Sequence, residues 1–219
     1  TYEAIEVPTG TFKAALDVFR AEGGLGANVT VPYKIDACAY ASDLTARARS
    51  AGSVNCLRFS GREALGANFD GVGLVTDLQA NLAVAIRGLR VLLLGAGGAA
   101  RGIVLPLLEQ NPACLTVANR TAVRAAALAT AFAPHGTVSG VGYDELVGHS
   151  FDLVINATTA SINWQCPAIP PGVFAPGCLA YDLAYCRGAT PFLQLAYDAK
   201  CDRLVDGIGM LVEQAAEAF

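Results

Sequence analysis

Two patterns of apolar and polar positions divide the chain near Leu89. After this residue, apolar runs alternate with stretches of helical spacing, as in "LRVLLLG", "AGGAARGIVLPLLEQN" and "CLTVANRT". Further runs, "DLVINAT" at 152–158 and "CLAYDLAY" at 178–185, predict later strands, and "ATPFLQLAYDAK" at 189–200 predicts a helix. Apolar strands that alternate with helices are typical of a parallel sheet covered on both faces. We therefore expect an α/β unit in this part of the chain.

The segments before Leu89 are shorter. "TYEAIEV" predicts a strand, "GTFKAALDVFRAEG" a helix that ends at a glycine, and "GANVTVP" and "VNCLRFSG" two short strands. A long helical pattern then runs from Asp70 to Gly88. The sequence thus predicts a second α/β unit, a junction near residues 80–88 and a ligand site in the cleft between the units.

Composition and charge narrow the function. The 219 residues are 53% hydrophobic with a formal net charge of −4, so an anionic ligand must be held by a few local cations, and no nucleic-acid partner is expected. No uncharged run reaches the roughly 18 residues of a membrane span, and no signal peptide is recognisable. We expect a cytoplasmic protein without a membrane partner.

The cysteines and histidines offer no metal site. The seven cysteines are Cys38, Cys56, Cys114, Cys166, Cys178, Cys186 and Cys201. They are odd in number and contain no C-x-x-C pair, which argues against a zinc site and a disulfide framework. The only histidines, His135 and His149, lack a ligand-spaced partner. Most of the cysteines are expected to be small core residues in a reducing compartment.

A glycine-rich turn follows the first apolar run. Gly95, Ala96, Gly97, Gly98, Ala99 and Ala100 match G-x-G-x-x-A between a strand and a helix. In such a turn the first glycine allows the tight bend, the second lets the backbone approach a pyrophosphate, and the helix N-terminus attracts the anion. Glycine-rich turns also simply end strands, but this context favours a dinucleotide cofactor.

The next predicted strand ends at Asn119, Arg120 and Thr121. An NAD enzyme usually places an acidic residue here to hold the ribose 2′-hydroxyl, whereas Arg120 and Arg124 provide cations for a 2′-phosphate. The alternative is a pair of solvated surface arginines. The position at the strand end favours NADP as the cofactor.

Lys34 and Asp70 are the candidate reactive pair. Lys34 follows the strand-like segment "NVTVP", and Asp70 stands in "GANFDGVG" at a predicted strand-to-helix junction. Lysines after strands are usually solvated, and an aspartate at such a junction can be a helix N-cap. Asp70 could instead pair with Lys34 across the cleft.

The ordered motifs resemble the shikimate dehydrogenase family. They are "NVTVPYK", "AGSVNCL", "GANFDGVG", "GAGGAARG", "ANRT", "NAT", "YDLAY" and "DGIGMLVEQAAEAF". The resemblance implies a substrate domain over 1–84, a Rossmann-type NADP-binding domain over 85–205, and a C-terminal helix over 206–219 that returns to the substrate domain. It also implies NADP-dependent, reversible reduction of 3-dehydroshikimate to shikimate, a step of chorismate and aromatic amino-acid biosynthesis, by a monomer or homodimer.

The resemblance also implies roles for individual residues. Lys34 and Asp70 match the catalytic pair, with a protonated lysine acting as general acid in the reduction and as base in reverse. Positions that surround shikimate match Thr30, Asn55, Tyr185 and Gln214. Positions beside the cofactor match Thr158, Leu183 and Gly207.

Three departures from the family pattern leave alternatives open. Phe69 replaces a threonine of the usual Asn-Thr-Asp-Gly motif, and Thr159-Ala160-Ser161-Ile162 replaces a glycine motif with serine. The family's first strand, with its paired serines, and the end of its last helix have no counterpart in this chain, so terminal segments are expected to be lacking. The alternatives are a quinate or shikimate-like dehydrogenase with an altered pocket, and a catalytically silent NADP-binding module.

Overall fold

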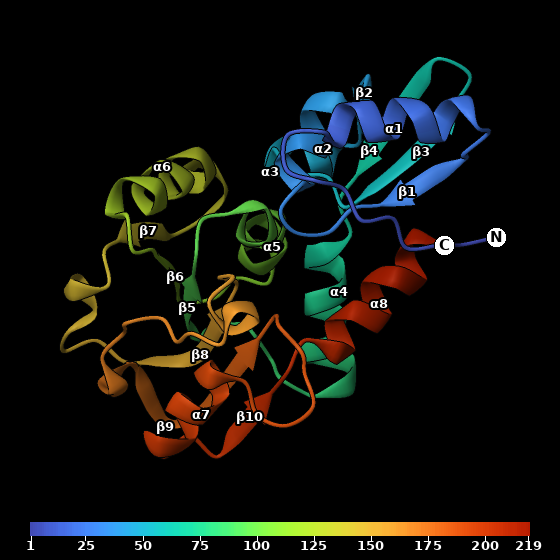
Figure 1. Cartoon of the computed structure of the whole chain (residues 1–219). Helices are drawn as coiled ribbons and strands as arrows, with labels where there is room; N and C mark the ends of the chain where they lie inside the picture. The colour runs from blue at the N-terminus through green and yellow to red at the C-terminus, as the bar shows by residue number, and fades with distance from the viewer. The chain divides into compact units, whose positions relative to one another are not determined.

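The computed structural model describes residues 1–219 as an α/β protein with two separate sheets (Figure 1). Contacts within the chain group residues 1–68 into a first unit and residues 69–219 into a second. The sequence predicts the boundary at residue 84, whereas the contacts place it at residue 68. The boundary is earlier because the helix that begins at Asp70 packs against helices of the second unit. No helix is both long and apolar enough to cross a membrane.

The second unit is built on six parallel strands in the order β10-β9-β8-β5-β6-β7. The strands are β5 (Arg90–Leu94), β6 (Cys114–Ala118), β7 (Val138–Val141), β8 (Phe151–Asn156), β9 (Phe174–Asp182) and β10 (Arg203–Val205). The helices are α4 (Asp70–Thr76), α5 (Gly98–Glu109), α6 (Ala122–Phe132), α7 (Pro191–Asp198) and α8 (Ile208–Ala218). This order is that of a Rossmann-type sheet, as the sequence predicts.

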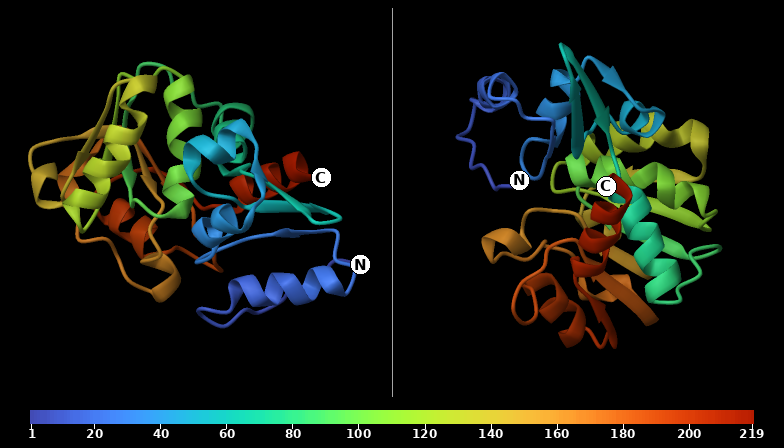
Figure 2. Two further views of the ribbon diagram at one scale, coloured as in Figure 1. Left: turned by 90° about the horizontal axis from the view of Figure 1, so that it is seen from above. Right: turned by 90° about the vertical axis from the view of Figure 1, so that its right-hand side faces the viewer.

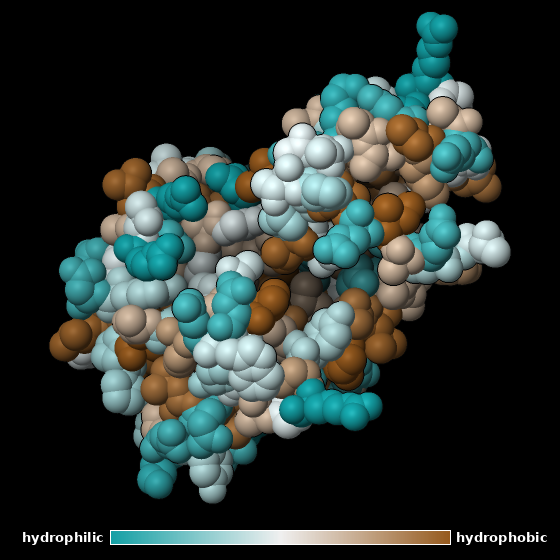
Figure 3. All heavy atoms as spheres, in the orientation of Figure 1, coloured by the Kyte–Doolittle hydropathy of each residue, from teal (hydrophilic) through white to brown (hydrophobic).

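Both faces of this sheet are buried, which explains its uninterrupted apolar runs (Figure 2). Along β5, Val91 and Leu93 pack with residues of α5 and α6, while Leu92 and Leu94 pack with residues of α7 on the opposite face. Successive side chains of a strand point to opposite faces, so a strand covered on both sides needs apolar residues throughout. The exposed apolar side chains, by contrast, are scattered on the face seen in Figure 3.

Two glycines let α4 pack closely between two other helices. A Cβ atom on Gly71 would collide with Pro106 of α5, and one on Gly73 would lie 2.7 Å from the backbone nitrogen of Gln214 in α8. Neither position leaves room for a Cβ atom, so only glycine permits the two helices to come this close to α4. The "DGVG" motif therefore shapes a three-helix contact within the second unit.

The first unit contains a four-stranded sheet in the order β1-β3-β4-β2. Its strands are β1 (Gly26–Asn28), β2 (Asp43–Leu44), β3 (Cys56–Ser60) and β4 (Glu63–Ala67), and its helices are α1 (Phe12–Ala21), α2 (Lys34–Tyr40) and α3 (Ala46–Ala51). Phe12 and Leu16 of α1 join Val29, Leu57 and Phe59 in a separate small core.

Several predicted elements of the first unit differ in the structure. Residues 1–7 form no strand, because β1 pairs only with β3 and this segment has no hydrogen-bonded strand beside it. Side chains hold the segment to the unit instead; the Tyr33 hydroxyl, for example, donates to the Val7 carbonyl at 2.7 Å. β1 ends at Asn28, so the predicted strand through Pro32 is too long. The prediction of a helix up to Gly88 is also wrong.

That helix ends early because its last turn loosens. After α4, a π-helical turn spans Asp77–Asn81, and Ala83 then adopts a left-handed conformation with φ of 53°. The Leu82 N–H donates to the Asp77 carbonyl five residues back. A non-glycine residue in this region of φ cannot continue a right-handed helix.

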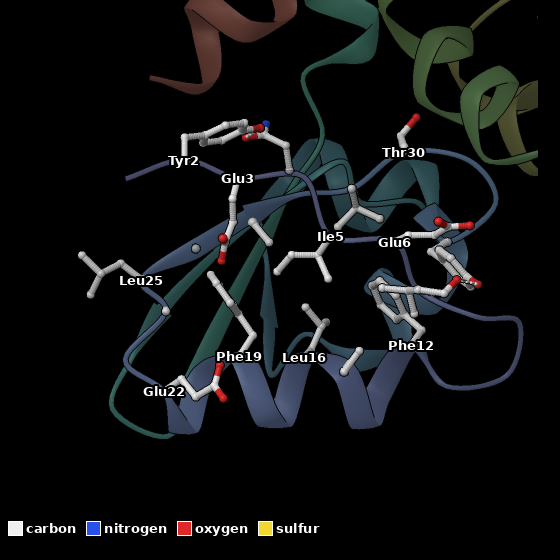
Figure 4. A pocket seen from close by; sticks show the side chains of 18 of the residues that line it. Tyr2, Glu3, Ile5, Glu6, Phe12, Leu16, Phe19, Glu22, Leu25 and Thr30 are labelled. Atoms are coloured by element: carbon white, nitrogen blue, oxygen red, sulfur yellow. Dashed lines mark hydrogen bonds between the residues drawn. The ribbon is translucent and has the colours of Figure 1, made fainter.

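A groove of about 860 Å³ lies within the first unit (Figure 4). It runs between the N-terminal segment, α1 and β1, and Phe12, Leu16 and Phe19 of α1 point into it. Among the predicted site residues only Thr30 lines it. This groove is thus not built from the residues that the sequence singles out.

The close approach at Gly73 can be tested by adding one methyl group. We expect Gly73→Ala to lower the free energy of unfolding by about 1–3 kcal/mol, because the backbone of α8 must move away. Gly172→Ala is the matched control, since nothing lies within 4 Å of its Cβ position. Urea unfolding measures both. A Gly73→Ala protein as stable as the control would contradict the packing described.

Candidate active site

The glycine turn lies at the point where the strand order of the second unit reverses. β5 is flanked by β6, the next strand in sequence, and by β8, so the turns after β5 and β8 border a crevice at the carboxyl ends of the strands. Gly95 has φ of 108°, and its Cβ position lies 3.1 Å from the Ala157 carbonyl oxygen and 3.3 Å from the methyl carbon of Thr158. The structure thus brings Gly95 and Thr158 together.

The rest of this turn is open where a phosphate would need room. Gly97 is exposed, and a Cβ atom on it would meet nothing within 4 Å. α5 begins at Gly98, while Ala100 is fully buried against the core. An open backbone next to a helix N-terminus fits the pyrophosphate of a dinucleotide, because the first N–H groups of a helix have no acceptor within the helix.

Two arginines stand beyond the next strand, β6. Arg120 follows Asn119, whose side-chain amide donates to the Thr121 carbonyl at 3.0 Å, and Arg124 lies in the first turn of α6. Both arginine side chains are exposed, and neither forms an ion pair. Two such cations with no carboxylate at this strand end suit a ribose 2′-phosphate better than a ribose 2′-hydroxyl.

Three predicted site residues meet in the first unit. The Val29 N–H donates to the Asn55 carbonyl at 2.7 Å, and the Val54 N–H donates to the Lys34 carbonyl at 2.8 Å. These bonds hold the segment with Thr30 and Lys34 beside the segment with Asn55. The sequence predicts Lys34 at the end of a strand, but in the structure it is the first residue of α2. The turn before it is closed by a hydrogen bond from the Tyr33 N–H to the Thr30 carbonyl.

Asp70 stands at the strand-to-helix junction that the sequence predicts. β4 ends at Ala67, and Asp70 is the first residue of α4, with an exposed fraction of 2%. The N-cap is Phe69, so Asp70 is not the capping residue. Since Lys34 belongs to the first unit and Asp70 to the second, their pairing stays a prediction.

The remaining predicted residues lie on two connected segments of the second unit. The Leu183 N–H donates to the Asn156 carbonyl at 2.9 Å, and the Gly207 N–H donates to the Ala184 carbonyl at 3.1 Å. A Cβ atom on Gly207 would collide with the Leu183 carbonyl, so these two residues touch through their backbones. Tyr185 is exposed, and Gln214 lies on α8, where its amide donates to the Leu211 carbonyl.

A buried polar cluster beside these residues was missed by the sequence analysis. Its members, none more than 7% exposed, are Asn156, Ser161, Asp182 and Thr190. Asp182 accepts from the hydroxyls of Ser161 and Thr190, both at 2.6 Å, and burial raises the pKa of its carboxyl. The signal was present: "DLVIN" and "CLAYD" are apolar runs that each end in a polar residue.

A second missed contact joins three elements. The Tyr181 hydroxyl of β9 donates to the Asp77 carboxylate at 2.6 Å and accepts from the Met210 N–H of α8 at 3.2 Å. Burial and the neighbouring carboxylate raise the pKa of Tyr181 well above its usual range. Because the charge of Asp77 requires such partners when buried, this contact fastens α8 to the helical segment after α4.

The thiols and acidic groups form no cluster that could bind a metal. No group of three or more His, Cys, Asp or Glu residues could hold a metal ion. Cys178 and Cys201 are buried, and burial, reinforced by the Cys201 thiol, raises the pKa of Cys178 to about 12. A thiol with such a pKa is protonated at neutral pH and is a poor nucleophile. Cys166 and Cys186 are exposed and thus lie outside the core.

The chain matches known protein families and named relatives. The family described as "Shikimate dehydrogenase substrate binding domain" matches residues 1–57, and "Shikimate / quinate 5-dehydrogenase" matches residues 77–164. Proteins named shikimate dehydrogenase (NADP(+)) from Chromobacterium violaceum and Nitrosospira multiformis are 54% and 53% identical to the chain. Each match covers all of this chain and 80% and 79% of the relative.

Solved structures are similar over almost the whole chain. An Ael1 enzyme from Pseudomonas putida is 46% identical with a TM-score of 0.86, over 99% of this chain and 79% of that one. Shikimate 5-dehydrogenase from Thermus thermophilus, in complex with NADP(H) and shikimate, is 29% identical with a TM-score of 0.84, over 100% of this chain and 80% of that one. On the strength of the relatives that are more than half identical over its full length, the chain belongs to the shikimate dehydrogenase family.

Proposed function

We propose that this chain is an NADP-dependent shikimate dehydrogenase, which reversibly reduces 3-dehydroshikimate to shikimate in chorismate biosynthesis. The observation that carries the proposal is the glycine turn at the strand-order reversal, with Arg120 and Arg124 at the end of the neighbouring strand. The identity of more than 50% to relatives named shikimate dehydrogenase (NADP(+)) supports the same activity.

The residues of the second unit fit the cofactor. Gly95, Gly97 and the N-terminus of α5 would hold the pyrophosphate, Arg120 and Arg124 the 2′-phosphate, and Thr158, Leu183 and Gly207 the nicotinamide side. NADPH bound there would supply the hydride that reduces the carbonyl carbon of 3-dehydroshikimate. The chain's own task is then to place the substrate and to move one proton.

Lys34 is the proposed proton donor. When the carbonyl carbon gains a hydride, its oxygen develops negative charge and takes one proton to become the hydroxyl of shikimate. Lys34 as an ammonium gives that proton, and as an amine it accepts it in the reverse direction. Asp70 is the proposed partner that would orient Lys34. Thr30, Asn55, Tyr185 and Gln214 are the proposed partners of the substrate's polar groups.

The last part of the proposal concerns the cellular compartment and the oligomeric state of the enzyme. We infer a cytoplasmic enzyme that acts as a monomer or homodimer on a small molecule. All seven cysteines are free thiols, as suits a reducing compartment.

A comparison of substrates and cofactors tests the proposal. We expect the chain to oxidise shikimate with NADP more efficiently than quinate, and NADP to be preferred over NAD. Arg120→Ala should reduce that cofactor preference by about a hundredfold, since it removes charge-assisted bonds worth roughly 1.5–3 kcal/mol each. Arg203→Ala, another exposed arginine of the second unit, is the control. Preference for quinate would favour a pocket altered by Phe69, and binding of NADP without turnover would favour a silent module.

The open backbone at Gly97 gives a separate test of the cofactor site. We expect Gly97→Val to weaken NADP binding at least about tenfold, because its side chain would fill the space of the pyrophosphate. Its φ of −85° suits any residue, so the loss of stability should stay at about 1 kcal/mol or less. Gly95→Val should instead unfold more easily, because φ of 108° disfavours a branched side chain. Calorimetric titration and thermal unfolding separate the two outcomes.

The role of Lys34 can be separated into chemistry and binding. Lys34→Met keeps much of the side-chain length but cannot donate a proton, so kcat should fall about a hundredfold or more while KM for shikimate changes much less. Lys13→Met, on the exposed face of α1, is the matched control and should retain the parental kcat. A parental kcat in Lys34→Met, with a large rise in KM, would make Lys34 a binding residue instead.

A further inference from the structure

The polar cluster of Asn156, Ser161, Asp182 and Thr190 joins two loops at one edge of the sheet. Asn156 and Asp182 are the last residues of the neighbouring strands β8 and β9, and Ser161 and Thr190 belong to the segments that follow those strands. Because β8 and β9 are parallel and directly paired, both segments leave the sheet on the same side. The cluster thus links the segment that follows β8 to the segment that follows β9.

Both oxygens of the buried carboxylate have partners. One oxygen of Asp182 accepts from the Ser161 and Thr190 hydroxyls, both at 2.6 Å, and the other accepts from the Asn156 amide at 3.0 Å and the Ala184 N–H at 3.1 Å. A carboxylate that is fully withdrawn from water is stable only with such a set of donors. The two hydroxyls cannot move away without leaving Asp182 unsatisfied.

The bonds of the cluster extend into the backbone of both loops. Asn156 accepts from the Thr158 hydroxyl at 2.7 Å, and the Thr158 oxygen in turn accepts from the Ala160 N–H. Ser161 begins a 3-10 turn that ends at Asn163. On the other side, Thr190 caps α7 by accepting from the Leu193 N–H at 3.2 Å. The positions of both loops are therefore set by one buried carboxylate.

These loops follow β8 and β9, which lie on the side of β5 opposite to β6 and its arginines. In a doubly wound sheet, the two halves on either side of the reversal each take one nucleotide of the cofactor. The end of β6, with Arg120 and Arg124, belongs to the adenosine half. The loops after β8 and β9 consequently border the nicotinamide half.

We propose that Ser161, Asp182 and Thr190 form a loop clamp, a set of positioning residues that fixes the nicotinamide half of the cofactor site. The inference rests on the proposed function for the identity of the cofactor. The clamp residues themselves need not touch NADP. They act through Asn156, whose side-chain amide donates to Asp182 and Ser161. Asn156 in turn accepts from the Thr158 hydroxyl and, through its backbone carbonyl, from the Leu183 N–H.

The chain offers matched substitutions for a test. Ser161→Ala removes one of the two hydroxyl donors to Asp182, and Thr190→Val removes the other hydroxyl while keeping the side-chain shape. Thr190→Ser keeps the hydroxyl and should rescue. Ser139→Ala makes the same chemical change as Ser161→Ala on β7, at the opposite edge of the sheet.

Two ligands distinguish the halves of the site. Calorimetric titrations compare NADP with adenosine 2′,5′-bisphosphate, which lacks the nicotinamide half. For Ser161→Ala and Thr190→Val we expect affinity for NADP to fall about tenfold or more, with affinity for the bisphosphate within about twofold of the parent. Thr190→Ser and Ser139→Ala should bind both ligands as the parent does.

A readout in the ligand-free protein completes the experiment. Trp164 is the only tryptophan of the chain, and it directly follows the 3-10 turn that Ser161 begins. Loss of the clamp should change its acrylamide quenching, whereas Ser139→Ala should not.

The outcomes separate the clamp from the proposed function. Parental NADP affinity in both clamp variants would overturn the clamp, and so would an equal loss for both ligands, which would indicate general destabilisation. A parent that binds NADP but does not oxidise shikimate would refute the proposed function while the clamp could still be confirmed by binding. A parent that binds neither ligand would overturn both.

Discussion

The parallel pairing of β5 with β8 is the constraint on which the second unit depends. These two strands come from separate parts of the sequence, and their pairing places the turn at Gly95 against Ala157 and Thr158. A side chain at Gly95 would need a disfavoured conformation and would also press on the Ala157 carbonyl. The positive φ of the turn and the close approach of β8 therefore both require glycine at position 95. The phosphate-binding turn thus depends on the pairing of β5 with β8.

Glycine and buried carboxylates play complementary parts around this sheet. Gly71 and Gly73 remove side chains where α4 meets α5 and α8, so that the helix backbones come close. Asp77 and Asp182 do the opposite, because each is a buried carboxyl group that accepts hydrogen bonds from other elements. Close packing fixes distances between helices, whereas Asp77 fastens α8 to the segment after α4 and Asp182 joins the loops after β8 and β9.

The sequence predicted most of the second unit and less of the first. Runs such as "LRVLLLG" are apolar throughout because both faces are covered, and this signal needs no knowledge of the fold. Residues 1–7 have the composition of a strand but no hydrogen-bond partner in a sheet, and composition alone cannot reveal a missing partner. The contact of Asp77, in the π-helical turn, with Tyr181 was similarly hidden, because Tyr181 lies more than a hundred positions later in the chain. The glycine turn and arginines were found by local spacing, while Ser161 and Thr190 act only through a distant carboxylate.

The contact between α4 and α8 has a consequence for the order of folding. All six strands of the Rossmann-type sheet lie between these two helices in sequence, yet the helices pack directly on each other. During synthesis α4 emerges early, and the side of it that packs on α8 stays uncovered until the sheet and α8 have been made. Contacts between residues that are so far apart in sequence slow folding. The helix that carries Asp70 is therefore expected to reach its final packing among the last steps of folding, so that the site is completed only when the rest of the unit is in place.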